Sequence, residues 1–317
     1  MNFRTVMPIN KSHLDISYLD KILFLGSCFS ENINEKLVER KFDSRSNPFG
    51  ITYNPISIFN IIDFVLEEKN YTKEDLFLQN EIWNCYDFHS DMSGLEVENV
   101  LRNINEKIIE TKTFLKETNV LFITLGTAWV YENNNKIVAN CHKVPSSQFE
   151  KRLLTFEEIE TKAKSTFAKL KQFNENIKIV FTLSPVRHLK DGFVENNLSK
   201  SILLVAINNL QKEKNISYFP AYELVIDDLR DYRFYKEDLV HPNYLAINYI
   251  FEQFKSVFFT EKTLTLLVKV EKLLKAFQHR INYKETQEYI KFRKNLEKQV
   301  ADLSAVEIDF SKELSNY

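Results

Sequence analysis

Three short apolar runs, each ended by glycine or proline, constrain the fold of this chain more than any other feature. They cover residues 21–25, 119–125 and 177–183, and the residues that follow are Gly26, Gly126 and Ser184-Pro185. Runs of this length that are rich in β-branched and aromatic residues are typical of buried strands. Glycine is scarce, at five residues in 317. A glycine at a strand end therefore indicates a turn in which a Cβ would not fit.

Segments with helical periodicity lie between and after these runs. They cover residues 31–40, 56–67, 97–116, 156–173, 197–214 and 244–258. Strands that alternate with helices imply βαβ crossovers, and hence a parallel sheet covered by helices on both faces. We predict one three-layer α/β/α domain over residues 1–260. Because ligands bind at the carboxyl ends of such strands, the site should follow positions 25, 125 and 183.

Three segments do not follow this alternation. Residues 71–94 are aromatic and loop-like, and residues 130–149 resemble a hairpin that turns at Asn133-Asn134-Asn135. We expect both to be insertions that wall the strand ends. Residues 261–317 form a Lys-, Glu- and Leu-rich helical extension. It either packs on the domain or serves as an arm for homo-oligomers, and its apolar stripe favours packing. The stripe comprises Leu264, Leu267, Val270, Leu273, Leu274 and Phe277.

Composition excludes several classes of protein. The 42 basic and 44 acidic residues give a formal charge of -2, which disfavours nucleic acid as the main partner. No apolar run approaches the roughly 18 residues needed to span a bilayer, and no secretory signal is visible. Three cysteines without a Cys-x-x-Cys pair indicate a reducing compartment. We therefore expect a cytoplasmic protein without a membrane span.

The first strand leads through Gly26-Ser27-Cys28 directly into a helix. The N-terminus of a helix stabilises an anion and lowers the pKa of a thiol, so this turn suits a nucleophile. The alternative is that Ser27 caps the helix and Cys28 is a small buried residue.

Far downstream, Asp238-Leu239-Val240-His241-Pro242 precedes the helix that begins near Tyr244. An Asp and a His three residues apart on a loop can form a carboxylate–imidazole hydrogen bond that orients the ring toward a nucleophile. Such a pair is weak evidence alone, but its combination with the Gly-Ser-Cys turn is much stronger.

These motifs together resemble a known family. The segment from Gly26 to Glu31 resembles the first block of the SGNH/GDSL hydrolases, and Asp238-x-x-His241 resembles their last block. More closely, the chain resembles the GSCFA family within that superfamily, over roughly residues 20–255. The further motifs are Asn47-Pro48-Phe49-Gly50, Leu125-Gly126-Thr127-Ala128-Trp129 and Ser184-Pro185-Val186-Arg187-His188. The resemblance implies a flavodoxin-like fold and ester hydrolysis or acyl transfer, with an acylated carbohydrate as the default substrate.

The same resemblance suggests roles for individual residues. Cys28 falls on the position of the catalytic serine, and Ser27, on the preceding position, is the rival nucleophile. His241 is then the general base and Asp238 its orienting partner. The N–H groups of Cys28 and Gly50 would bind the oxyanion.

The third block is incomplete in this chain. Gly126 is present, but Ala128 replaces the asparagine that usually donates to the oxyanion. Asn47, Asn140, His142 and Trp129 lie on loops that could supply the missing donor or line the site.

The remaining candidates for substrate binding are Arg187, His188 and His89. Arg187 offers a planar fork for a carboxylate or phosphate, or else a loop-ordering salt bridge to Asp191 or Asp231.

Two alternatives remain open. One is a metal-dependent hydrolase that draws its ligands from the histidines, the cysteines and Asp238. Those residues are His89, His142, His188, His241, Cys28, Cys85, Cys141 and Asp238. The other is an inactive binding module on the same fold. The preferred hypothesis requires neither a metal nor a cofactor.

Overall fold

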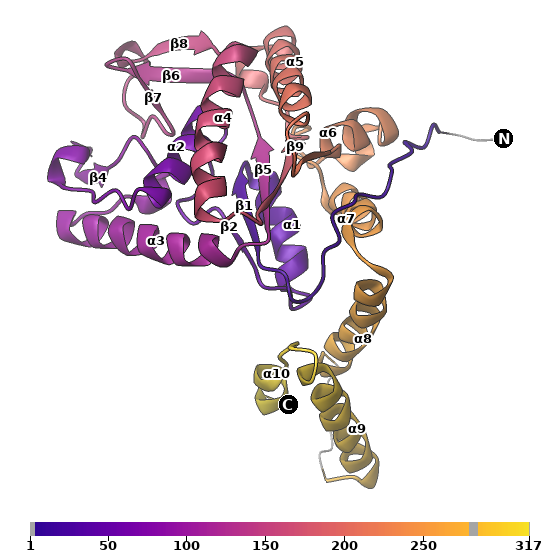
Figure 1. The fold of residues 1–317 in the computed structure, drawn as a ribbon. Coiled ribbons are helices and arrows are strands. Elements are labelled where there is room, and N and C mark those ends of the chain that lie inside the picture. The colour runs from indigo at the N-terminus through magenta and orange to yellow at the C-terminus, as the bar shows by residue number, and fades with distance from the viewer. Residues whose placement is uncertain (1–3, 279–284, 317) are drawn as a thin grey trace.

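A five-stranded parallel sheet forms the centre of the molecule (Figure 1). The computed structural model describes residues 4–278 and 285–316. The strand order is β10-β9-β5-β1-β2. The strands are β1 (Ile22–Gly26), β2 (Ser44–Ser46), β5 (Val120–Leu125), β9 (Lys178–Leu183) and β10 (Ile216–Phe219). The three central strands are the predicted runs, whereas the two short edge strands were not predicted because they lack a long apolar run.

The register of the central strands aligns their carboxyl ends. Gly26 of β1 pairs with Thr124 of β5, and Thr124 pairs with Thr182 of β9. The turns that follow these strands therefore meet at one edge of the sheet. The direction of strand addition reverses between β1 and β5, which is the point where ligands bind in sheets of this order.

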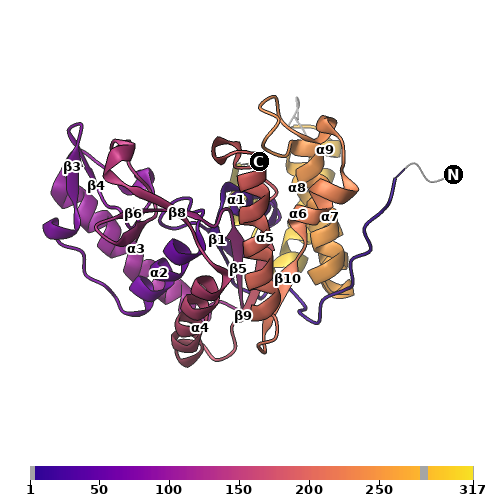
Figure 2. The same cartoon turned by 90° about the horizontal axis from the view of Figure 1, so that it is seen from above.

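Helices cover both faces of the sheet, as the view from above shows (Figure 2). Alternate strand residues pack toward opposite faces, Leu23 and Leu25 toward one and Ile22 and Phe24 toward the other. The first face is covered by α2 (Pro55–Leu66), α3 (Val97–Glu117), α4 (Phe156–Phe173) and α5 (Phe193–Leu210). The second face is covered by α1 (Cys28–Val38) and α7 (Tyr244–Phe258). The predicted three-layer α/β/α fold is confirmed.

Local side-chain bonds set where the helices begin. Asn54, Thr155 and Asn243 cap α2, α4 and α7, and Thr155 forms a capping box with Glu158. The first helix begins three residues earlier than predicted because Ser27 caps it. Short helical turns complete the connections: α6 (Ala221–Glu223), η1 (Lys73–Asp75), η2 (Ser90–Met92), η3 (Ser146–Gln148), η4 (Leu189–Asp191), the π-turn η5 (Leu224–Asp228) and η6 (Tyr232–Phe234).

The two predicted insertions are small antiparallel sheets. Residues 71–94 contain the hairpin β3 (Phe77–Gln79) and β4 (Ile82–Asn84). The second sheet joins β6 (Trp129–Asn133), β7 (Lys136–Val138) and β8 (Glu150–Leu153). Asn134 and Asn135 adopt left-handed φ angles of 50° and 61° in the β6–β7 turn, so the hairpin prediction is confirmed.

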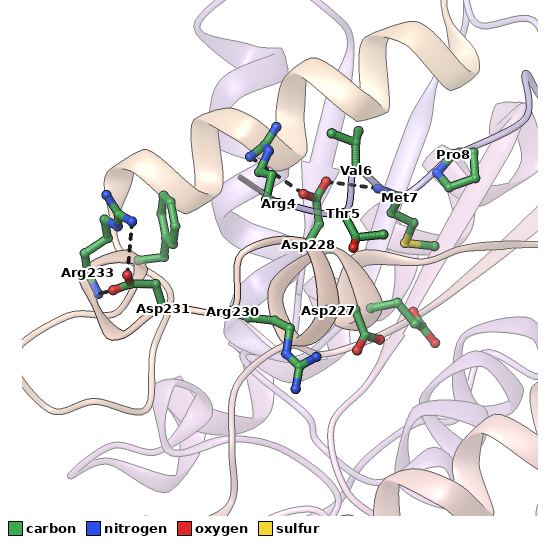
Figure 3. Close-up of a pocket in the computed structure, with 12 residues that line it drawn as sticks. Arg4, Thr5, Val6, Met7, Pro8, Asp227, Asp228, Arg230, Asp231 and Arg233 are labelled. Atoms are coloured by element: carbon green, nitrogen blue, oxygen red, sulfur yellow. Dashed lines mark hydrogen bonds and ion pairs between the residues drawn. The ribbon is translucent and has the colours of Figure 1, made fainter. Parts of the chain in front are cut away.

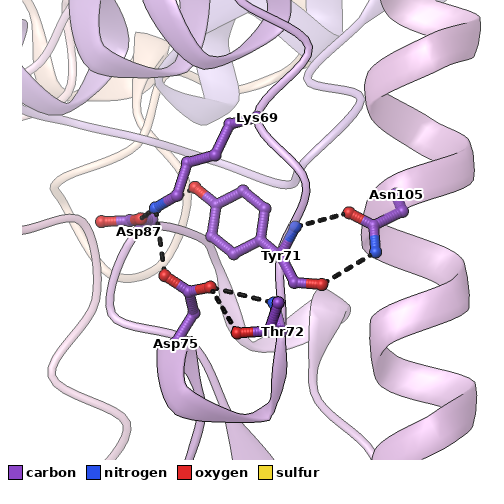
Figure 4. A network of polar contacts seen from close by, with 6 residues as sticks. All are labelled: Lys69, Tyr71, Thr72, Asp75, Asp87 and Asn105. Atoms are coloured by element: carbon purple, nitrogen blue, oxygen red, sulfur yellow. Dashed lines mark hydrogen bonds and ion pairs between the residues drawn. The ribbon is translucent and has the colours of Figure 1, made fainter.

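A polar network anchors the first insertion to α3 (Figure 4). The Tyr71 hydroxyl donates to Asp87 over 2.8 Å, and the Lys69 ammonium lies 3.1 Å from the same carboxylate. Asn105 of α3 exchanges two hydrogen bonds with the Tyr71 backbone. Burial and the Asp87 charge raise the pKa of Tyr71, so its hydroxyl stays a donor.

The C-terminal segment forms α8 (Glu261–Phe277), α9 (Gln287–Ser304) and α10 (Ser311–Asn316). Leu267, Val270 and Leu273 of α8 are buried in the same hydrophobic core as the inner faces of α1 and α7. The prediction that the apolar stripe packs on the domain is therefore confirmed. Arg40, which follows α1, pairs with Glu271 over 2.7 Å. No helix among residues 4–278 and 285–316 is both long and apolar enough to cross a bilayer.

Phe122 tests the core between the sheet and the helices α1 and α7. Its ring stacks on Phe24 at 4.6 Å and is 2% exposed. We expect Phe122→Ala to lower the free energy of unfolding by about 3–5 kcal/mol, because it removes a buried ring and leaves a cavity. Phe193→Ala is the control, since that ring is 69% exposed, and its effect should stay within about 0.5 kcal/mol. Urea denaturation measures both, and equal losses would contradict this packing.

Candidate active site

The turn after β1 is built by close backbone contact. Gly26 has a φ of +128°, and a Cβ at this position would collide with the Thr124 carbonyl. The Ser27 N–H donates to that carbonyl over 3.1 Å, and the Ser27 Oγ accepts from the Phe29 N–H. Ser27 is fully buried and acts as the N-cap of α1. Cys28 is consequently the first helical residue, and it is half-buried.

The thiol of Cys28 experiences opposing influences. Burial raises the pKa of Cys28, and the nearby Glu31 carboxylate raises it further. The Lys236 charge and the N–H groups of Cys28 and Phe29 act in the opposite direction but do not outweigh these effects. The expectation of a lowered thiol pKa is therefore wrong, because burial and Glu31 dominate over the helix N-terminus.

Asp238 and His241 form the predicted pair on the loop between η6 and α7. His241 Nδ1 lies 2.7 Å from Asp238 Oδ2, while Asp238 Oδ1 accepts from the N–H groups of Val240 and His241. Those backbone bonds, and then the imidazole bond, lower the pKa of Asp238 to about 2. A carboxylate on Nδ1 leaves Nε2 free to face a reacting group.

The loop that carries His241 approaches the N-terminus of α1. The Lys236 N–H donates to the His241 carbonyl over 2.7 Å, and the Lys236 charge acts on the Cys28 thiol. Within the residues that the structure describes, no hydrogen bond joins Cys28 Sγ to His241. Catalytic hydrogen bonds are often long before substrate binds, so the absence of this bond is compatible with a nucleophile–base pair.

Arg187 supports the His241 loop. Its guanidinium donates to the Leu239 carbonyl and lies 4.9 Å from the centre of the Tyr235 ring. Its predicted alternative partners are engaged elsewhere, Asp191 with Lys151 and Asp231 with Arg233. Arg187 therefore connects the end of β9 to the Asp238–His241 turn, and its role in substrate binding stays a prediction.

His188 and Tyr53 lie beside each other at the same edge. Their rings meet edge-to-face at 5.4 Å, and the buried His188 Nε2 has no hydrogen-bond partner among the described residues. Burial, and then the Lys200 charge, lower the pKa of His188 to about 4, so its imidazole is neutral at pH 7. Burial and the charges of Cys28 and Glu31 raise the pKa of Tyr53.

Lys200 was missed by the sequence analysis. It lies on α5, is 2% exposed, and donates through Nζ to the carbonyls of Gly126 and Ser184 at 2.7 Å each. Burial lowers the pKa of Lys200 to about 7. One signal could have revealed it, because Lys200 shares the helical spacing of the buried residues Leu203 and Ile207.

Gly50, Gly126 and Asn47, three of the predicted oxyanion-site residues, are engaged within the turns themselves. The Gly50 N–H donates to the Asn47 carbonyl and the Gly126 N–H to the Tyr53 carbonyl, both over 2.8 Å. The Asn47 side chain accepts from the Gly26 N–H and donates to Glu31. For Gly50, a role as an oxyanion donor stays a prediction that requires its present bond to open.

Four further candidates lie in the walls built by the insertions. His89 packs over Gly50, and Trp129 donates through its indole to the Glu195 carbonyl at 3.3 Å. Asn140 and His142 line a cavity of about 600 Å³ next to the β3–β4 hairpin. His142 Nε2 lies 2.8 Å from the Cys85 carbonyl, and burial lowers the pKa of His142. Their substrate contacts stay predictions.

A separate cavity of about 870 Å³ lies between residues 4–8 and residues 223–234 (Figure 3). The buried Asp228 lies at its centre, accepts from Tyr249 at 2.5 Å and from the Met7 N–H, and lies 3.6 Å from Arg4. These contacts hold residues 4–8 on the domain, and none of the predicted site residues lines the cavity.

As for a metal centre, residues 4–278 and 285–316 contain no cluster of three or more His, Cys, Asp or Glu side chains arranged to hold an ion.

The lowered pKa of Lys200 predicts a pH-dependent stability. The unfolded chain holds this proton up to a pKa of about 10.4, whereas the folded chain releases it near 7. The unfolded state therefore binds more protons between these values, and the folded state gains stability as the pH rises. Relative to Lys200→Met, the free energy of unfolding of wild type should rise by up to about 1.4 kcal/mol per pH unit. Urea denaturation at a series of pH values measures it. The stability of the Ser199→Ala control should depend on pH in the same way as that of wild type. The same pH dependence in Lys200→Met would contradict the lowered pKa of Lys200.

The chain is similar to a defined family along most of its length. The model of the GSCFA family matches residues 21–254, and the model described as GSCFA domain protein, C-terminal domain, matches residues 270–316. No curated protein matches the chain. A solved structure of a carbohydrate esterase family 3 protein from Talaromyces cellulolyticus is similar over 78% of this chain and 98% of that chain, with 10% identity and a TM-score of 0.36. On the extent of the first match, which spans the sheet and the candidate site, the chain belongs to the GSCFA family.

Proposed function

We propose that this protein is an ester hydrolase or acyltransferase in which Cys28 is the nucleophile. The observation that carries the proposal is the 2.7 Å bond between Asp238 and His241, on a loop whose Lys236 charge acts on the Cys28 thiol. An imidazole oriented by a carboxylate near a thiol at a helix N-terminus is the arrangement needed for acyl transfer.

The raised pKa of Cys28 makes a base necessary. At neutral pH the thiol is largely protonated, so His241 must remove its proton as Sγ attacks the acyl carbonyl. The tetrahedral intermediate collapses to a thioester, and the leaving alcohol takes the proton from His241. Water or an acceptor alcohol, deprotonated by His241, then attacks the thioester and restores the Cys28 thiol.

The substrate is proposed only by class. The resemblance to the SGNH/GDSL superfamily favours an acylated carbohydrate, and either water or an alcohol can accept the acyl group. A cytoplasmic location and homo-oligomers formed through the C-terminal helices stay predictions. The alternative of an inactive binding module is less well supported, because a binder has little use for an imidazole oriented by a carboxylate.

An acyl-enzyme test addresses Cys28 directly. We expect p-nitrophenyl acetate to leave an acetyl group on Cys28, detected by peptide mass spectrometry after an acid quench. Cys28→Ala should abolish the burst of nitrophenol, whereas Cys141→Ala should retain it, because Cys141 is also a half-buried free thiol but lies in the second insertion. His241→Ala should slow acylation about 100-fold or more. An acetyl group on Ser27 or Cys141 alone, or no acyl-enzyme at all, would contradict the proposal.

We further propose that the Tyr53 hydroxyl replaces the missing asparagine donor of the third block. No hydrogen bond engages this hydroxyl among the described residues, and it lies close enough for charge on Cys28 to raise its pKa. Its backbone carbonyl accepts from the N–H groups of Gly126 and Thr127, so the tyrosine is held by that same block. A neutral phenol beside a developing oxyanion is a suitable donor.

Tyr53→Phe tests this donor with little change of shape. We expect kcat to fall about 100-fold with KM nearly unchanged, because the lost bond forms mainly in the transition state. Tyr131→Phe removes a hydroxyl from an exposed side chain of β6 and should leave the kinetics of p-nitrophenyl acetate hydrolysis unaltered. A Tyr53→Phe enzyme with wild-type kcat would show that another group binds the oxyanion.

A further inference from the structure

Lys200 connects the carboxyl ends of two central strands. Its Nζ donates to the carbonyl of Gly126, directly after β5, and to the carbonyl of Ser184, directly after β9, each over 2.7 Å. Gly126 belongs to the turn that packs on Tyr53, and Ser184 opens the segment that carries Arg187 and His188. One ammonium group thus joins the loops that follow β5 and β9, the two central strands on one side of the strand that leads to Cys28.

This buried ammonium has no carboxylate partner. None of the ion pairs formed within residues 4–278 and 285–316 includes Lys200, although its side chain is almost completely enclosed. The buried Asp63, by contrast, is paired with Lys162 at 2.6 Å. An uncompensated buried charge is unfavourable, and a methionine of similar volume would avoid that cost. Such an unfavourable group at the edge of a sheet indicates a functional role.

The charged and titratable neighbours of Lys200 define what it can stabilise. The negative charge of ionised Cys28, in α1, raises the pKa of Lys200. The Lys200 charge lowers the pKa of His188, in the β9–α5 connection. The centre of the Tyr222 ring, in α6, lies 5.7 Å from Lys200 Nζ. Neither His188 nor Tyr222 carries negative charge near neutral pH. Cys28 is therefore the neighbour whose negative charge Lys200 can balance.

We propose that Lys200 is a positioning residue of the active site, which clamps the Gly126 and Ser184 carbonyls and balances negative charge that forms at Cys28. This inference rests on the proposed function in one respect, that Cys28 is the group that becomes negative. Lys200 keeps its proton when Cys28 is ionised and readily loses it when Cys28 is neutral. The clamp and the charge reach the reaction through Cys28 and the loops that follow β5 and β9, not through contact with substrate.

The first experiment separates the charge of Lys200 from its packing. The pH dependence of Cys28 alkylation by limiting iodoacetamide, read by peptide mass spectrometry, reports the thiolate fraction. In Lys200→Met we expect alkylation near neutral pH to slow about tenfold, which corresponds to about one pKa unit. Lys200→Gln keeps an amide donor without charge and should behave like Lys200→Met. A wild-type profile in either variant would overturn the proposal.

Ser199→Ala is the matched control for that experiment. Ser199 is the preceding residue of α5, is 2% exposed, and accepts from the Ala128 N–H over 2.7 Å. Its loss removes a buried bond between the same helix and the same turn but changes no charge. We expect a reduced stability with an unchanged alkylation profile. An equal slowing in Ser199→Ala would assign the effect to packing and overturn the role of the charge.

A second experiment leaves Lys200 in place, in case its variants do not fold. In protein carrying ¹³C-labelled lysine, the Cε resonance of Lys200 reports its protonation. Cys28→Asp places a permanent negative charge at the start of α1, and Cys28→Asn is its neutral isostere. We expect a higher titration midpoint for Lys200 in the aspartate variant, and equal midpoints would refute the coupling. This readout requires no ester turnover, so a failed acyl-enzyme test and a failed coupling are distinguishable.

Discussion

The in-register pairing of β1, β5 and β9 is the constraint on which the rest of the structure depends. Gly26, Thr124 and Thr182 lie side by side across the sheet, so all three strands end together. The backbone approaches so closely there that Gly26 cannot carry a Cβ. Because the strands are parallel, the connections after them must turn at the same edge. Residues far apart in the chain are brought together for that reason.

The electrostatics of this edge result from burial more than from pairing. Burial raises the pKa of Cys28 and lowers those of His188 and Lys200, which keeps uncharged forms accessible near neutral pH. Asp238 is the opposite case, since backbone N–H groups hold it ionised. A thiol that is protonated at rest, at the same sheet edge as an exposed imidazole with a fixed partner, suits the proposed nucleophile, which would be activated only when substrate arrives.

Local motifs predicted much of this arrangement. The glycine-terminated runs indicated the central strands, the helical periodicity indicated the covering layers, and Asp238 with His241 followed from their spacing on one loop. The edge strands β2 and β10 were not predicted, because three or four residues carry too little pattern. The pKa of Cys28 was predicted in the wrong direction, because a sequence shows a helix start but not how deeply a side chain is buried.

The sequence by itself determined the alternation of strands and helices, the GSCFA motifs and the bond between Asp238 and His241. Each of these depends on residues that are close together in the chain or on a regular period of hydrophobicity. Only the tertiary structure decided that Lys200 reaches the carbonyls of Gly126 and Ser184, and that Arg187 holds the carbonyl of Leu239. Those contacts join residues 16 to 74 positions apart, which meet only because parallel strands end at one edge and α5 packs across them.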